Sequence, residues 1–67
     1  MSESQSGITE LWNEIKAVVA AAEVDVAKNA GGNSAAGVRV RKALRVLKGK
    51  SADLVKLTIS EEKSRKA

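Results

Sequence analysis

The chain has 67 residues and a formal net charge of +4, which arises from 12 Lys or Arg residues and 8 Asp or Glu residues. Its single aromatic residue is Trp12, and it has no Pro, Cys, His, Phe or Tyr. The sequence therefore excludes disulfide bonds, a Cys/His zinc site, thiol chemistry and a Ser-His-Asp triad. A chain this short, with a core of Ala, Val, Leu and Ile and no covalent or metal cross-link, usually needs oligomerisation for stability. We therefore expect a homodimer or a higher homo-oligomer.

The first predicted element is an amphipathic helix over about residues 7–28, which begins at Ser6 or Thr9. Its apolar positions recur at spacings of three and four residues and share an arc of roughly 120°. Trp12 lies in this apolar row, so we interpret it as a core residue or a dimer-interface anchor. The members of the row are Ile8, Leu11, Trp12, Ile15, Val18, Val19, Ala22 and Val26.

A Gly/Asn turn over residues 29–33 ends this helix, because glycine and asparagine tolerate a positive φ. Ser34 or Asn33 then caps a second helix over about residues 34–64, roughly 45 Å long. The positions 40, 44, 47, 51, 54 and 58 alternate spacings of four and three, which is typical of a coiled-coil seam. Gly49 lies inside this helix, and we favour a continuous helix over a break there because the seam keeps its phase.

Together the two elements predict an all-α fold, a single domain over residues 1–67 that forms an antiparallel helical hairpin with a long second helix. Folding at Gly31 places Val26 near Ala36, Ile15 near Leu47 and Ile8 near Leu54. A lone hairpin covers part of each apolar row, so two hairpins are expected to form a four-helix bundle or coiled coil.

Charge differs between the two predicted helices. Residues 1–30 contain two basic and five acidic residues, a net charge of −3, whereas residues 31–67 contain ten basic and three acidic residues, a net charge of +7. The positive half suits a polyanion, either nucleic acid or an acidic membrane surface, and the acidic half is an equally good intramolecular partner.

The basic residues of the second helix predict a nucleic-acid-binding face opposite the seam. Six positive charges and no acidic residue lie between Val38 and Lys50, whereas a merely solvated face usually mixes both signs. We therefore predict that this face binds double-stranded DNA through about five phosphates per protomer, which gives a slope of roughly −4.5 in log K against log salt. The predicted DNA-binding residues are Arg39, Arg41, Lys42, Arg45 and Lys48.

Enzymatic activity is not expected. Glu10 and Glu14 lie one turn apart, and Glu61 and Glu62 each precede a basic residue by four positions, which is ordinary helix-surface pairing. Acid–base catalysis needs a concave pocket, which a two-helix hairpin lacks. The Gly31-Gly32 turn lacks the Gly-Lys-Ser/Thr of a phosphate-binding loop. We expect no catalytic residue, cofactor, metal or small-molecule substrate.

The stretch from Gly32 to Leu44 resembles the signature of the chlamydial-type bacterial histone-like proteins, small DNA-binding proteins named for a likeness to linker histone. The matching string is G-N-x-A-A-x-x-R-V-R, and the resemblance continues to Ser64, over about half of the chain. It implies a nucleoid-associated protein that binds DNA with little sequence preference and compacts it. The arginines of the motif correspond to Arg39 and Arg41. Family members carry a long Lys/Ala/Pro-rich tail that does much of the DNA binding, whereas Ser64 is followed here by Arg65, Lys66 and Ala67, so the helical core is the part expected to be shared.

Two other classes compete with the DNA-binding interpretation. A protein-interaction module, in which the basic helix pairs with an acidic partner helix, explains the charge asymmetry equally well. An amphipathic helix on an anionic membrane is the weaker alternative, because the second helix offers no aromatic anchors. No segment reaches the roughly 18 to 20 apolar residues of a membrane span, and residues 1–5 lack the basic start of a signal peptide. A cytoplasmic location, in the nucleoid, is therefore expected.

Overall fold

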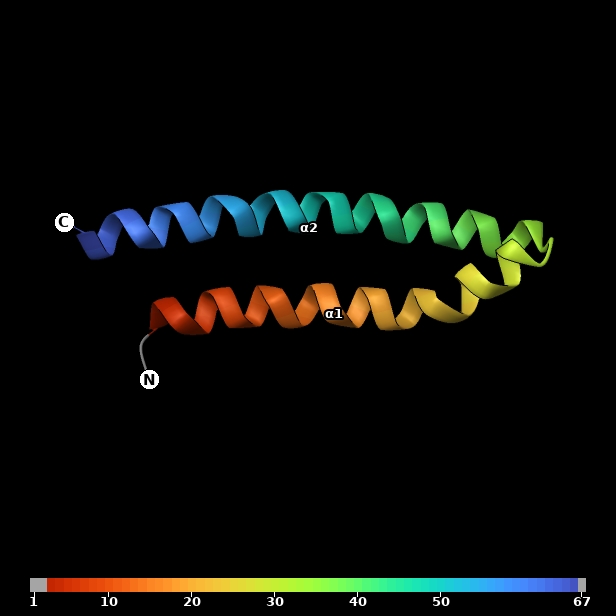
Figure 1. The fold of residues 1–67 in the computed structure, drawn as a ribbon, viewed down its shortest axis with the longest axis horizontal. Coiled ribbons are helices and arrows are strands. Elements are labelled where there is room, and N and C mark those ends of the chain that lie inside the picture. Colours follow the sequence, from red (N-terminus) through yellow and green to blue (C-terminus); the bar gives the residue numbers. More distant parts are fainter. Residues whose placement is uncertain (1–2, 67) are drawn as a thin grey trace.

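The computed structural model describes residues 3–66, and the surroundings of side chains are described for residues 7–65. Helix α1 spans Glu3–Ala30 and helix α2 spans Ser34–Lys66. The helices lie side by side and antiparallel, so that the beginning of α1 and the end of α2 are at the same end of an elongated molecule of 52 × 20 × 12 Å (Figure 1). The predicted all-α hairpin with a long second helix is confirmed.

Both helices are longer than the sequence pattern predicted. Helix α1 begins at Glu3, so neither Ser6 nor Thr9 begins it, and the predicted capping role of the Ser6 side chain lies outside the described side chains. Helix α2 continues without a break through Gly49. A Cβ atom at Gly49 would have no neighbour within 4 Å, which places this glycine on an open surface of the helix.

Local hydrogen bonds explain the sharp turn between the helices. Gly32 has a φ of 105°, and its amide donates to the carbonyl of Asn29 at 3.0 Å, while the amide of Asn33 donates to the carbonyl of Lys28 at 3.0 Å. This pair of bonds is a Schellman motif, which satisfies the last carbonyl groups of α1. The side-chain Oδ1 of Asn33 accepts from the amide of Ala36 at 3.0 Å, so Asn33 and not Ser34 caps α2.

The seam between the helices differs from the predicted seam on α2. Val40, Leu47, Leu54 and Thr58 are partly buried, as predicted, but Leu44 and Ser51 are exposed. Ala43 and Lys50, each one place earlier in the chain than Leu44 and Ser51, are partly buried in their place, so α2 is rotated about its axis relative to the predicted orientation. The buried or partly buried residues of this observed row are Ala36, Val40, Ala43, Leu47, Lys50, Leu54, Leu57 and Glu61.

The rotation has an identifiable physical basis. Lys50 in the observed row reaches the carboxylate of Glu14 on α1, with Nζ and Oε1 2.6 Å apart, so its stem lies along the seam and its charge at the edge. Leu57 packs against the backbone at Gly7, where a Cβ would be 3.7 Å from Leu57 Cδ2. The predicted row would instead have placed Ser51 against α1, and the short polar side chain of Ser51 has little apolar area to bury.

The alignment of the two helices is also shifted from the prediction. Pairing Ile15 with Leu47 implies that Glu14 lies opposite residue 48, whereas Glu14 bonds to Lys50. Gly7 lies beside Leu57 in the same shifted alignment, so α2 is displaced by about two residues. The hydrophobic spacing repeats along each helix and is compatible with both alignments.

The hairpin by itself has very little core. Among the described side chains, the buried hydrophobic residues are Ile15, 9% exposed, and Ala36, 0% exposed. The accessible surface is 5070 Å², whereas a compact protein of 7.0 kDa is expected to expose about 4000 Å². The excess reflects a two-helix layer with both flanks open to solvent.

Candidate nucleic-acid interface

Four of the five predicted DNA-binding residues share the outward side of α2. Val40, Ala43 and Leu47 face α1, and the basic side chains lie on the other sides of α2, with Lys42 at the edge of a groove that Val18 and Asp25 of α1 also line. All four are exposed, and none forms an ion pair among the described side chains. We call this group the outer basic face; its members are Arg41, Lys42, Arg45 and Lys48.

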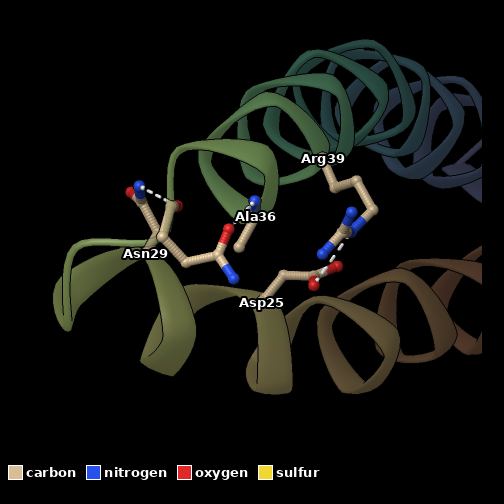
Figure 2. A network of polar contacts seen from close by, with 5 residues as sticks. Asp25, Asn29, Ala36 and Arg39 are labelled. Carbon is tan, nitrogen blue, oxygen red and sulfur yellow. Dashed lines mark hydrogen bonds and ion pairs between the residues drawn. The ribbon is translucent and has the colours of Figure 1, made fainter.

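Arg39, the fifth predicted residue, has a different environment. Its Nε donates to Oδ1 of Asp25 on α1 at 3.0 Å, and the two side chains bridge the helices near the turn (Figure 2). The Arg39 side chain is still 53% exposed, but its guanidinium already has a carboxylate partner. The structure therefore separates Arg39 from the outer basic face and directs it toward α1.

Lys50 and Arg39 together define one flank of the hairpin, which we call the ion-paired flank. Each links α2 to an acidic residue of α1, Lys50 to Glu14 and Arg39 to Asp25. Of the six cations between Arg39 and Lys50, two therefore pair with α1 and four face solvent. The predicted pairing of Glu61 with Arg65 is not among the ion pairs between residues 7 and 65, and the predicted partner of Glu62, Lys66, lies outside the described side chains.

The motif that carries the family resemblance builds the corner of the hairpin. Gly32 and Asn33 form the turn and the cap, and Ala36 is completely buried against α1. A Cβ at Gly37 would lie 2.6 Å from Nδ2 of Asn29, whose amide donates to the carbonyl of Asn33 at 3.2 Å (Figure 2). The small residues of the motif therefore allow the two helices to approach closely beside the turn.

Two further lysines extend the outer basic face and were not among the predicted site residues. Lys56 and Lys63 are exposed and continue on the same side of α2. From Arg41 to Lys63 the helix rises about 33 Å at 1.5 Å per residue. A helical wheel of the sequence places both lysines opposite the predicted seam, and this position is the signal by which they could have been included in the site.

The described part of the chain offers little for other chemistry. Between residues 3 and 66 there is no group of three or more His, Cys, Asp or Glu residues arranged to hold a metal ion. Neither α1 nor α2, as described, is long and apolar enough to span a membrane. Glu10 and Glu14 are both exposed on α1, and no concave site surrounds them.

Comparison with known proteins places the chain in one family. The family of the histone H1-like protein Hc1 matches residues 9–64, which covers both helices and the turn between them. Comparisons with curated proteins and with solved structures gave no significant match. This family consists of histone-like DNA-binding proteins and is not a family of enzymes. Because the match extends over most of the sequence and includes the corner motif and the outer basic face, the chain belongs to the histone H1-like Hc1 family.

Proposed function

We propose that this protein binds double-stranded DNA through the phosphate backbone, with little sequence specificity, and contributes to chromosome organisation or compaction in the bacterial nucleoid. The observation that carries the proposal is the outer basic face, four exposed cations on one side of α2 that have no acidic partner among the described side chains. Membership of a histone-like family supports the same conclusion.

The electrostatics of the outer basic face favour phosphate contacts. Arg41 and Arg45 suit bidentate hydrogen bonding to phosphate oxygens, and Lys42 and Lys48 add point charges. Like charges at this density repel one another in the free protein, and phosphates relieve that repulsion while condensed counterions are released from the DNA. Four neutralised phosphates per protomer predict a slope of roughly −3.6 in log K against log salt.

The shape of α2 also suits the DNA backbone. The helix spans Ser34–Lys66 without a break and presents exposed basic residues on one side from Arg41 to Lys63. The basic residues from Arg41 to Lys63 extend over about 33 Å, close to the rise of one turn of B-form DNA. The outer basic face has no aromatic ring and no Asn or Gln to read base edges, which accords with recognition of the backbone.

The first test is binding to an arbitrary duplex over a series of salt concentrations. We expect tight binding at low salt that weakens steeply as salt increases. The double variant Lys42→Gln/Lys48→Gln should lower the salt slope by roughly 1.8, because two phosphate contacts are lost. A matched control is Lys16→Gln/Lys28→Gln, which makes the same change in net charge on α1 and should leave the slope close to that of the unaltered chain.

Two results would contradict the proposal. Absence of binding at about 50 mM salt, where phosphate contacts are still strong, would exclude DNA as the partner of this face. Equal effects of the two double variants would show that net charge, and not the outer basic face, governs binding. In the first case the helical protein-interaction module, whose basic helix pairs with an acidic partner helix, becomes the better explanation.

A further inference from the structure

The outward side of α2 carries its unpaired basic residues in two groups. The first group is the outer basic face, which ends at Lys48, and the second consists of Lys56 and Lys63, which we call the distal lysine pair. Both distal lysines are exposed, and neither forms an ion pair among the described side chains. On a helical wheel the distal lysine pair and Arg45 share an arc of roughly 20°, almost directly opposite the row that faces α1. The two groups therefore point in the same direction and can contact the same ligand.

The surface between the two groups is neutral and small. From Lys48 to Lys56 the helix rises about 12 Å at 1.5 Å per residue. Lys50, the one cation in this interval, reaches Glu14 of α1, and the outward positions are the exposed Gly49 and Ala52. The one acidic residue of the interval, Asp53, lies roughly 70° around the helix from the line through Gly49 and Ala52. The outward side of α2 is thus basic, then neutral, then basic again.

The glycine in this interval is not required by the fold of the hairpin. Gly49 lies inside a continuous helix, where glycine is a poorer helix former than alanine. A Cβ atom there would have no neighbour within 4 Å, and among the described residues the glycine with a positive φ is Gly32. Neither close packing nor backbone conformation therefore accounts for Gly49. A missing side chain does allow another molecule to approach the helix backbone closely.

The spacing of the two basic groups matches a dimension of B-form DNA. The major groove is about 12 Å wide and admits an α-helix, and the phosphates of the two strands border it on either side. The base edges on its floor carry no phosphate charge. A helix that lies across this groove needs cations for both borders and a small, uncharged surface between them, and the outward side of α2 has this arrangement.

We infer that α2 lies across the major groove of a DNA duplex, with the outer basic face on the phosphates of one strand and the distal lysine pair on the phosphates of the other. This inference rests on the proposed function and adds to it the groove and the orientation of the helix. Gly49 and Ala52 then face the floor of the groove, and α1 lies on the side of α2 away from the DNA. The net charge of −3 over residues 1–30 is thereby kept far from the phosphates.

Contact with both strands has two measurable consequences. Six cations contribute instead of the four of the outer basic face, so the slope of log K against log salt becomes roughly −5.4 instead of −3.6. Binding also depends on the form of the duplex, because the major groove of A-form RNA is deep and narrow and does not admit side chains. On an RNA duplex the distal lysine pair has no second strand at the matching distance.

The test places an uncharged side chain in the middle of the interval. Gly49→Gln leaves the net charge unchanged and should retain the helix, since open surface surrounds this position. It should weaken binding to an arbitrary DNA duplex by at least about tenfold and lower the salt slope by roughly 1.8, because the distal lysine pair no longer reaches its strand. The matched control is Ala20→Gln, at an exposed position on the outward side of α1, which should change neither quantity. Circular dichroism verifies that both variants stay helical.

A second pair of measurements links the interval to the distal lysine pair. Lys56→Gln/Lys63→Gln should lower the salt slope by roughly 1.8 in the unaltered chain, but by much less in the Gly49→Gln background, where the same contact is already lost. On an RNA duplex of the same length, Gly49→Gln and the unaltered chain should bind equally well.

Several results would overturn the inference. One is an unchanged salt slope in a helical Gly49→Gln variant, and another is an equal loss of binding to the DNA and RNA duplexes. If Gly49→Gln loses helicity, the Lys56→Gln/Lys63→Gln variant decides, because these exposed lysines have no ion-pair partner among the described side chains. Binding of the unaltered chain with a slope near −3.6 that neither variant alters would leave the proposed function standing and the contact across the groove wrong. Absence of duplex binding by the unaltered chain would refute the proposed function and the inference together.

Discussion

At the scale of single residues, the turn between the helices depends on a few side chains with separate tasks. Gly32 supplies the positive φ of the Schellman motif, Asn33 caps α2, and Ala36 and Gly37 allow the helices to approach closely. The same stretch carries the family resemblance, so the matching residues specify the corner more than they specify a ligand. Arg39 extends this arrangement because its partner Asp25 lies one turn before Asn29 on α1.

Removing the cap should destabilise the hairpin measurably. Asn33→Ala leaves the amide of Ala36 without its side-chain acceptor and should lower the free energy of unfolding by about 1 kcal/mol. Ser34→Ala, at the neighbouring exposed position, should change it by less than about 0.5 kcal/mol. Urea unfolding of the two variants at the same protein concentration measures the difference, and equal effects would show that Ser34 contributes to the cap.

Releasing Arg39 should change how the protein binds DNA. In Asp25→Asn the guanidinium loses its carboxylate partner and becomes free to contact a phosphate, so the slope of log K against log salt should steepen by roughly 0.9. Glu10→Gln makes the same change in net charge at an exposed position of α1 and should leave the slope unchanged. Identical slopes for both variants would mean that Asp25 does not restrain Arg39. The exposed pair itself contributes at most about 1 kcal/mol to stability.

At the scale of the helices, each apolar row is covered only in part by the other helix. On α1, Ile8 and Ile15 face α2, while Trp12 and Val19 lie at the edge of the seam and are exposed. On α2 the same division separates Leu47 from Leu44. The apolar face of α1 is wider than one neighbouring helix covers, so the hairpin leaves Trp12, Val19 and Val26 exposed.

The open surface at Gly49 provides a test of the continuity of α2. Gly49→Ala should raise the free energy of unfolding by about 1 kcal/mol, because alanine is the better helix former and its Cβ meets nothing within 4 Å. Gly37→Ala makes the same chemical change but should give no such gain, since its Cβ would lie 2.6 Å from Nδ2 of Asn29. Urea unfolding followed by circular dichroism compares the two. Destabilisation by Gly49→Ala would contradict a continuous helix at this position.

At the scale of the whole molecule, the shortage of buried surface predicts that folding is coupled to self-association. With two buried hydrophobic side chains among those described, the hairpin has little apolar burial to set against the conformational entropy lost by about sixty helical residues. A partner that binds the folded hairpin and not the unfolded chain stabilises it by mass action. The melting temperature should therefore depend on protein concentration.

This dependence can be measured by circular dichroism. Over a roughly hundredfold range of concentration the stabilisation of the hairpin should rise by as much as about 2.7 kcal/mol, and the melting temperature should rise with it. The Val24→Glu variant should behave like the unaltered chain, whereas the melting temperature of Val19→Glu should be low and independent of concentration. A concentration-independent melting temperature in the unaltered chain would show that the hairpin is stable as a monomer.

The sequence by itself determined that the chain is helical, where the turn lies, and that the two helices run antiparallel. These features depend on local interactions: the spacing of apolar residues such as Ile8 and Leu11, the tolerance of Gly32 for positive φ, and the capping capacity of Asn33. The charges from Arg41 to Lys48 were likewise placed opposite the seam by the helical period alone.

Only the tertiary structure decided which apolar row of α2 faces α1. The rows that contain Ala43 and Leu44 have the same spacing of three and four residues, so periodicity cannot distinguish them. The choice depends on packing and on ion pairs between residues far apart in the chain, such as Glu14 and Lys50. The same contacts displaced α2 by about two residues, turned Arg39 toward Asp25 and left Trp12 on an open flank, because each of these outcomes is a property of two helices in contact and of neither helix alone.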